Sequence, residues 1–199
     1  MSTFISTTTR QQYLYTKWIY FCATFSYLHK IFLLETKPRI KINKSKTDRR
    51  LELFGGILLL LLWLITVYVY AHSPGTIPIH FDDSGKTNNY GSRNMLFFLT
   101  ILATIIYAGI TQLNKFPHIL NYPVKITAEN AAQQYSNATR MLRFLKAGVL
   151  LIFILLIVLE HLTALGIRKG IGGWFLPVVL CTTMLPTGFL LVQGFRKKK

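Results

Sequence analysis

The sequence is poor in charged residues, in cysteine and above all in acidic residues. Each shortage excludes some classes of protein. Only 15% of the 199 residues are charged, whereas a soluble domain carries about 25%, so an ordinary soluble domain is not expected. The two cysteines, Cys22 and Cys181, lie far apart in apolar surroundings and predict neither a disulfide framework nor a zinc site. Seven Asp and Glu residues stand against 23 Lys and Arg residues, and this basic excess needs its own explanation.

Hydrophobic residues, by contrast, make up 51% of the chain and gather in four blocks. Each block is long enough to cross a bilayer core, which takes about 20 helical residues. We therefore predict an all-α integral membrane protein in which four transmembrane helices form two hairpins. The four-helix domain covers residues 37–194, a basic tail occupies 195–199, and the spans lie at about 53–71, 95–113, 147–167 and 174–193.

Residues 1–36 form an aromatic extension whose apolar part, Trp18–Leu28, has only 11 residues. That length is short for a full crossing and favours an interfacial segment or an incomplete span. No small-residue cleavage site follows, so a removable signal peptide is not expected. A fifth span and a mis-assigned start are the open alternatives.

The basic residues lie mainly on alternate connections between the predicted spans. Sixteen lie on the side that holds Lys37 and the C-terminus, and four lie on the other side. The sixteen are at 37–50, 115–146 and 196–199, and the four are Lys86, Arg93, Arg168 and Lys169. This asymmetry follows the positive-inside rule, so we expect Lys37 and the C-terminus in the cytoplasm. The excess then contacts anionic head groups of the lipid bilayer. Nucleic acid is not an expected partner, because no binding module for it accompanies the charge.

The polar segment Ile77–Ser92, between the first two spans, contains the tetrapeptide SGKT at Ser84–Thr87. A Walker phosphate loop needs a glycine five residues before Gly85 and a helix directly after the motif. His80 stands at that glycine position, and a turn-forming sequence follows the motif. A phosphate loop is therefore not predicted.

The same segment could supply metal ligands, because it carries a histidine and two adjacent aspartates. The candidates are His80, Asp82 and Asp83, with His72 nearby. Their spacing matches no compact site, and adjacent aspartates before Ser-Gly more often shape turns. We predict no metal ion and no other cofactor.

What the outer segment does predict is a folded cap. Its prolines restrict the backbone and its glycines permit tight turns. Ile77, Ile79 and Phe81 alternate with polar or proline positions, which predicts a short extended segment with one apolar face. Such a segment would cover the outer mouth of the helix bundle and expose a polar rim for recognition or gating.

The motif in this loop is fairly specific. It consists of a proline, IPxHF, a glycine four residues after the phenylalanine, and an aromatic-Gly-Ser ending. The matching positions are Pro74, Ile77, Pro78, His80, Phe81, Gly85, Tyr90, Gly91 and Ser92. In these residues the chain resembles a bacterial multi-pass membrane domain of unknown function, which also forms the N-terminal part of the immunity protein family against the Sdp toxin. The resemblance covers about residues 37–194 and implies the fold, the topology and a place in the bacterial inner membrane. The immunity function transfers less readily, because those relatives carry further C-terminal spans.

The cytoplasmic loop between the second and third spans carries a second motif that is similar to the same family. A helix is expected to begin near Thr127 as its N-cap, with Glu129 in the first turn, and to run along the membrane surface into the third span. Arg140, Arg143 and Lys146 are expected at the lipid head groups. The motif residues are Asn121, Tyr122, Pro123, Thr127, Asn130, Arg140 and Arg143.

Glu160 and His161 place a carboxylate next to an imidazole near the end of the third span. Ionisable residues at membrane depth are functional candidates by default. This pair lies within about two helical turns of the outer end, where interfacial water can solvate both groups. A merely structural role is therefore the alternative.

Two classes of function fit this sequence. In the first, the cap engages a peptide ligand or a partner membrane protein without catalysis, in a toxin-immunity-like or envelope-stress role. In the second, the chain is a small transporter or channel subunit whose path is lined by Thr104, Thr111 and Gln112 beside Glu160 and His161. An enzyme is not expected, because no nucleophile elbow and no convergent His and acid occur.

Overall fold

The computed structural model describes residues 37–196. The expectations for residues 1–36, and for the tail beyond residue 196, lie outside this part of the chain. By internal contacts the chain divides into Met1–Lys37 and Pro38–Lys199, and the description below concerns the second unit. Its elements are α2 (Lys46–His72), β1 (Thr76–Phe81), β2 (Thr87–Ser92), α3 (Met95–Leu113), the 3-10 helix η1 (Pro117–Ile119), α4 (Ala131–Ala164) and α5 (Phe175–Arg196).

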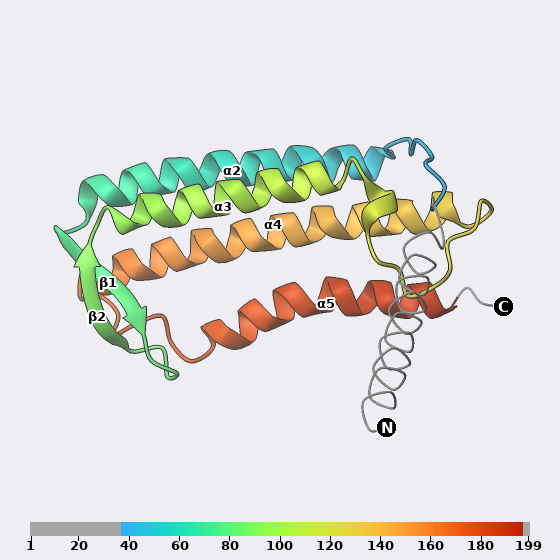
Figure 1. The fold of residues 1–199 in the computed structure, drawn as a ribbon. Helices are drawn as coiled ribbons and strands as arrows, with labels where there is room; N and C mark the ends of the chain where they lie inside the picture. The colour runs from blue at the N-terminus through green and yellow to red at the C-terminus, as the bar shows by residue number, and fades with distance from the viewer. Residues whose placement is uncertain (1–36, 197–199) are drawn as a thin grey trace, which may run out of the picture. The chain divides into compact units, whose positions relative to one another are not determined.

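Three of these helices, α2, α3 and α4, are long and apolar enough to cross a membrane. They run side by side, with the β-hairpin at the end where α2 and α4 finish (Figure 1). Their outward faces carry large apolar side chains, for example Leu60, Phe98 and Ile105, as expected of helices that contact lipid. The chain is thus an integral membrane protein. The fourth predicted span, 174–193, falls on the helix α5.

The helix boundaries differ from the predicted spans in two places. α2 begins at Lys46, seven residues before the predicted span, because Ser45 and Asp48 form a reciprocal capping box that starts the helix early. α4 is a single helix of 34 residues, which confirms that the amphipathic helix of the inner loop continues into the third span. α3 has the predicted bounds.

Two corrections concern the start of α4. The N-cap is Asn130 rather than Thr127, and Glu129 precedes the helix instead of lying in its first turn. The Asn130 side chain accepts a hydrogen bond from the Thr127 backbone N–H at 2.9 Å and donates one to the Lys125 carbonyl at 2.9 Å. These two hydrogen bonds close a turn before the helix. A turn therefore stands where the sequence predicted the first helical residues.

The outer segment is a two-stranded antiparallel hairpin, so the fold is mostly helical with a small sheet rather than all-α. β1 pairs with β2 from Thr76 opposite Ser92 to Phe81 opposite Thr87, with an irregularity around His80. The extended segment predicted around Ile77 is β1, whereas the partner strand was not predicted.

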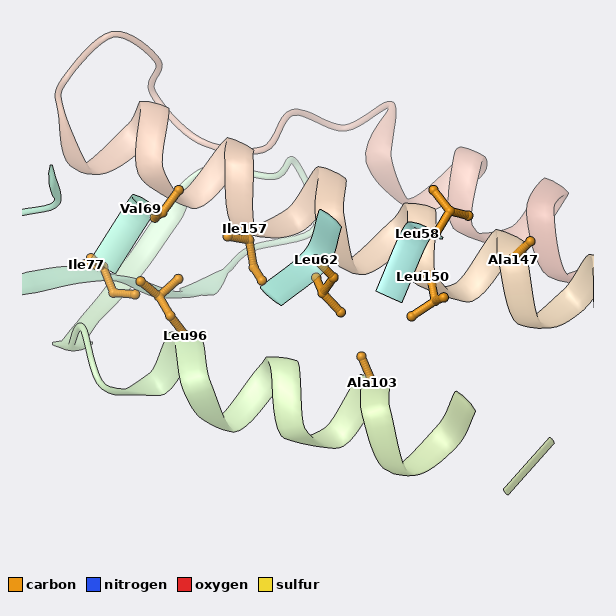
Figure 2. Packing of buried hydrophobic residues seen from close by; sticks show 9 residues of the cluster. All are labelled: Leu58, Leu62, Val69, Ile77, Leu96, Ala103, Ala147, Leu150 and Ile157. Atoms are coloured by element: carbon orange, nitrogen blue, oxygen red, sulfur yellow. The ribbon is translucent and has the colours of Figure 1, made fainter. Parts of the chain in front are cut away.

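The core lies where α4 packs against α2 and α3, and the hairpin contributes to it (Figure 2). Ile77 of β1 is only 1% exposed, and burying such a side chain is worth roughly 1.5–3 kcal/mol. Deeper in the bundle, the hydroxyls of Thr66 and Thr100 lie 2.6 Å apart and join α2 to α3. The buried apolar cluster consists of Leu58, Leu62, Val69, Ile77, Leu96, Ala103, Ala147, Leu150 and Ile157.

Candidate functional site

The tip of the hairpin is organised by the carboxylate of Asp82. Its Oδ1 accepts hydrogen bonds from Ser84 N at 2.9 Å, Ser84 Oγ at 2.7 Å and Lys86 N at 2.9 Å. The hydrogen bond from the Ser84 hydroxyl is the main cause that lowers the pKa of this exposed carboxyl. The Asp82 carboxylate therefore stabilises the turn that contains it, as the Asp-Asp-Ser-Gly sequence indicates. Among residues 37–196, no group of three or more His, Cys, Asp or Glu side chains could hold a metal ion.

Glycines dock the hairpin on the connection between α4 and α5. Gly85 has a φ of +75°, and a Cβ there would lie 2.5 Å from the backbone of Gly172. The Gly172 N–H donates to the Gly85 carbonyl at 3.2 Å, and Lys86 forms a β-bridge with Gly170. A Cβ on Gly170 would collide with the Gly85 carbonyl oxygen. The two loops thus meet backbone to backbone, an approach that only residues without side chains allow.

The apolar face of β1 anchors the hairpin to the helices. Ile77 is buried on this face, and Ile79 packs against the core cluster beside Gly91, whereas the neighbouring Pro78 is buried on the other face. Phe81 is only half-buried and lies outside that cluster. Of the predicted apolar face, Ile77 is the main anchor.

The exposed positions of the hairpin are mostly polar. Tyr90 is 61% exposed, and His80, Asn88 and Asn89 are exposed as well. His80 pairs with Asn89, and Tyr90 pairs with Pro78 one step along the ladder. The motif therefore separates into buried positions that hold the cap and exposed positions that face outward.

Arg93, just after the motif, closes the end of α2. Its Nη1 donates to the carbonyls of Tyr70 and Ser73 at 3.4 Å each, and its guanidinium lies 4.6 Å from the centre of the Tyr70 ring. The last carbonyls of a helix lack intrahelical donors, and a cation there also interacts favourably with the negative end of the helix dipole. Arg93 thus ties the hairpin to the helix that precedes it.

Glu160 and His161 lie at this outer end but point to different surroundings. His161 Nδ1 lies 2.7 Å from Ser73 Oγ, which links α4 to the C-cap of α2. Glu160 is only 4% exposed, and its Oε2 has no hydrogen-bond partner among the described residues. The expectation that interfacial water solvates both groups is therefore wrong for Glu160, because the side chain turns inward from α4.

A Ser–His contact is also the first part of a nucleophile-and-base arrangement. Here Ser73 is only 6% exposed. Within residues 37–196, no carboxylate forms a hydrogen bond with His161. This geometry suits a contact between helix ends better than an accessible nucleophile.

The inner-loop motif packs around Tyr122. Its hydroxyl donates to the Pro117 carbonyl at 2.8 Å, and its ring lies 5.5 Å from that of Tyr135. Burial raises the pKa of Tyr122. Asn121 and Pro123 flank it and line a shallow apolar cavity with residues of α4 and Thr187 of α5. This motif therefore fastens the inner loop to the start of α4.

The inner end of the bundle also holds a cluster of charges that we call the inner ion-pair cluster: Asp48 and Glu52 of α2 with Arg140, Arg143 and Lys146 of α4. Arg140 Nε lies 3.0 Å from Asp48 Oδ1, Arg143 Nε lies 3.0 Å from Glu52 Oε1, and Lys146 Nζ lies 2.7 Å from Glu52 Oε2. Lys146 Nζ also donates to Thr111 Oγ1 of α3 at 3.1 Å.

This cluster defines the protein contacts of the three basic residues that were expected at the lipid head groups. Arg143 is 4% exposed and Lys146 is fully buried, so both face the interior of the bundle, and Arg140 is 37% exposed and paired with Asp48. Charged groups at membrane depth face the bundle interior and pair with one another. Asp48 and Glu52 are functional candidates that the sequence pattern did not predict. The available signal was their spacing of four, which puts both on one face of a helix.

The comparisons with known proteins support the domain but assign no activity. Residues 57–107, which run from α2 through the hairpin into α3, match a family model described as a domain of unknown function, DUF1648. A protein of Archaeoglobus fulgidus, described as uncharacterized, is 31% identical over 87 residues, which cover 40% of this chain and 48% of that protein. The chain thus spans about half the length of this relative. No solved structure matches the present chain.

Proposed function

We propose that the chain is a non-catalytic, multi-pass protein of the bacterial cytoplasmic membrane whose outer hairpin recognises a peptide, in a toxin-immunity-like role. The observation that carries this proposal is the division of the hairpin into buried and exposed positions. The buried positions fix the hairpin to the bundle through Ile77 and through the contact between Gly85 and Gly172. The exposed positions include Tyr90 and His80. An aromatic ring and hydrogen-bonding groups on a rigid support are typical of recognition surfaces, because little entropy is lost on binding.

The hydrogen bonds of two threonines that could line a transport path favour recognition over transport. Thr104 accepts a hydrogen bond from Trp63 Nε1 at 3.2 Å and donates to the Thr100 carbonyl. Thr111 donates to the Tyr107 carbonyl and accepts from Lys146. These hydroxyls are therefore engaged in joining helices.

The first test concerns the side of the membrane on which the hairpin lies. With Cys22 and Cys181 replaced by serine, single cysteines at Ser84 and Gln133 are treated with an impermeant thiol reagent in intact cells. Both parent residues are exposed. The positive-inside asymmetry predicts labelling at 84 and protection at 133 until the membrane is permeabilised. The reverse pattern would contradict an outer cap.

The second test concerns recognition itself. A photo-crosslinking amino acid at Tyr90 is compared with one at Leu64, which is similarly exposed but lies on the apolar face of α2. Irradiated cells should give a peptide adduct at position 90 and none at position 64. An adduct with another membrane protein at position 90 would instead favour the partner-protein alternative. Equal products at the two positions would contradict recognition by the hairpin.

A further inference from the structure

A cavity of about 240 Å³ lies at the inner end of the bundle. It is bounded by the segment before α2, the first turns of α2, the C-terminal end of α3 and the N-terminal half of α4. A water molecule in the liquid takes up roughly 30 Å³, so the space is large enough for a small polar group with a few waters. It lies at the opposite end of the bundle from the hairpin.

Two side chains at this cavity have hydrogen-bonding atoms without partners. Arg143 is only 4% exposed, and its Nη1 lies 3.5 Å from Asp48 Oδ1 but forms no hydrogen bond with a described residue. Asn114, the C-cap of α3, has both amide atoms buried, and within residues 37–196 neither has a partner. Buried donors without acceptors are unusual in native proteins and call for a ligand or ordered water.

The charge around the cavity favours an anion. Arg143 and three exposed lysines, Lys41, Lys44 and Lys115, line it. Two carboxylates line it as well, but they are already neutralised. Asp48 is bonded to Arg140, and Glu52 accepts hydrogen bonds from both Lys146 and Arg143. Four lining cations against two paired carboxylates leave an electropositive site.

We propose that this cavity binds a phosphate group, supplied by the head group of an anionic phospholipid in the inner leaflet. Guanidinium and amide N–H groups are strong donors to phosphate oxygens, and Arg143 Nη1 and Asn114 Nδ2 supply them here. Asn114 Oδ1 is left to accept from a head-group hydroxyl. The exposed lysines at the rim would attract the phosphate by their charge, and the phosphate would replace the solvent counter-ions around them. This inference is independent of what the outer hairpin recognises.

The test uses the full-length protein, purified in a neutral detergent, and measures lipid binding by native mass spectrometry. Phosphatidylglycerol is compared with a glucosyl-diacylglycerol of the same acyl chains, which has no phosphate. The variants are Asn114→Leu, which removes both unpartnered atoms, and Lys115→Gln. Lys169→Gln, an exposed lysine at the outer end, is the matched control. Thermal unfolding without added lipid checks that each variant is folded.

We expect the wild type to prefer phosphatidylglycerol and Asn114→Leu combined with Lys115→Gln to weaken that binding about tenfold, as the loss of a hydrogen bond to a charged group predicts. Lys169→Gln should leave it unchanged. If millimolar inorganic phosphate displaces the lipid, the site also takes phosphate from solution; if it does not, the lipid is the source. Equal binding of the two lipids, or equal losses in the double variant and the control, would overturn the proposal.

Discussion

The two ends of the bundle are held together by different means. At the outer end, the hairpin meets the α4–α5 connection through backbone contacts between Gly85, Gly170 and Gly172. At the inner end, α2 and α4 are joined through the charged side chains of the inner ion-pair cluster. Backbone contacts fix a loop in one position and depend on shape, whereas ion pairs depend on complementary charge.

This difference indicates where each end can tolerate change. Gly85, Gly170 and Gly172 cannot be replaced without strain, but most exposed side chains of the hairpin are free to vary for recognition. At the inner end a single neutralisation leaves an unpaired charge in the bundle, and breaking a buried pair costs far more than the pair contributes. The predictions below test this contrast, beginning with the largest expected effect.

Glu52→Gln should be the most damaging substitution. It leaves Lys146, which is fully buried, and Arg143 without their shared carboxylate, and breaking a buried pair costs about 3–5 kcal/mol. The free energy of unfolding, measured by denaturant titration of the purified protein in mixed micelles, checks this. The double variant Glu52→Gln, Lys146→Met should lose less than the sum of the two single losses, because both partners are removed together. Additive losses would show that the pair is not coupled.

Gly85→Val comes next, and Gly91→Val is its matched control. Gly85 requires a positive φ, which costs roughly 1–3 kcal/mol for a side-chain-bearing residue, and the new Cβ would meet the backbone of Gly172. Gly91 has no positive φ, and its nearest neighbour is the flexible end of Ile79. We expect Gly85→Val to expose the hairpin to limited proteolysis and Gly91→Val to do so less. Equal sensitivity would contradict backbone docking.

The sequence predicted the long helices well because their signal is local. The uncharged run 95–113 is bounded by polar loops and became α3 with the same ends. The start of α2 was missed because Lys46–Glu52 is charged and does not look like membrane sequence. Only the capping box at Ser45 and Asp48 marks it as helical.

The candidate site was only half predictable, for the opposite reason. β1 has alternating apolar residues. β2, with the sequence TNNYGS, has no such alternation, because most of its residues are exposed. Its pairing depends on the turn at Asp82 and on docking against Gly172, about 90 residues away in sequence. The ion pairs join Asp48 and Arg140 across a similar separation. Contacts of this range leave no periodicity in a single sequence.

Thr66→Val tests the apolar middle of the bundle, between the two ends. The Thr66 hydroxyl bonds to Thr100 at 2.6 Å and also to the Leu62 carbonyl. Interhelical hydrogen bonds in membranes contribute about 0.6 kcal/mol on average, and valine keeps the volume. We expect a loss of about that size in the free energy of unfolding, smaller than for Gly85→Val. A loss as large as that of Glu52→Gln would show that polar contacts in the middle matter as much as the charged end.

Asp82→Asn should have the smallest effect. The three hydrogen bonds that Asp82 Oδ1 accepts come from Ser84 and Lys86, and an amide oxygen can accept them as well. The turn should therefore survive the substitution, and the proteolysis rate of the hairpin at neutral pH should stay close to that of the wild type.

The same residue predicts how the turn responds to acid. The pKa of Asp82 is lowered in the folded protein, chiefly by the hydrogen bond from the Ser84 hydroxyl. A lowered pKa means that the ionised carboxyl favours the folded turn. This contribution is complete above the unfolded pKa of about 3.9 and is lost as the pH falls through the lower folded value. Amide exchange at Ser84 and Lys86 should therefore gain protection from Asp82 at neutral pH and lose it in strong acid. The Asp82→Asn variant should show no such pH dependence in its protection, and a persistent dependence there would assign the effect to another group.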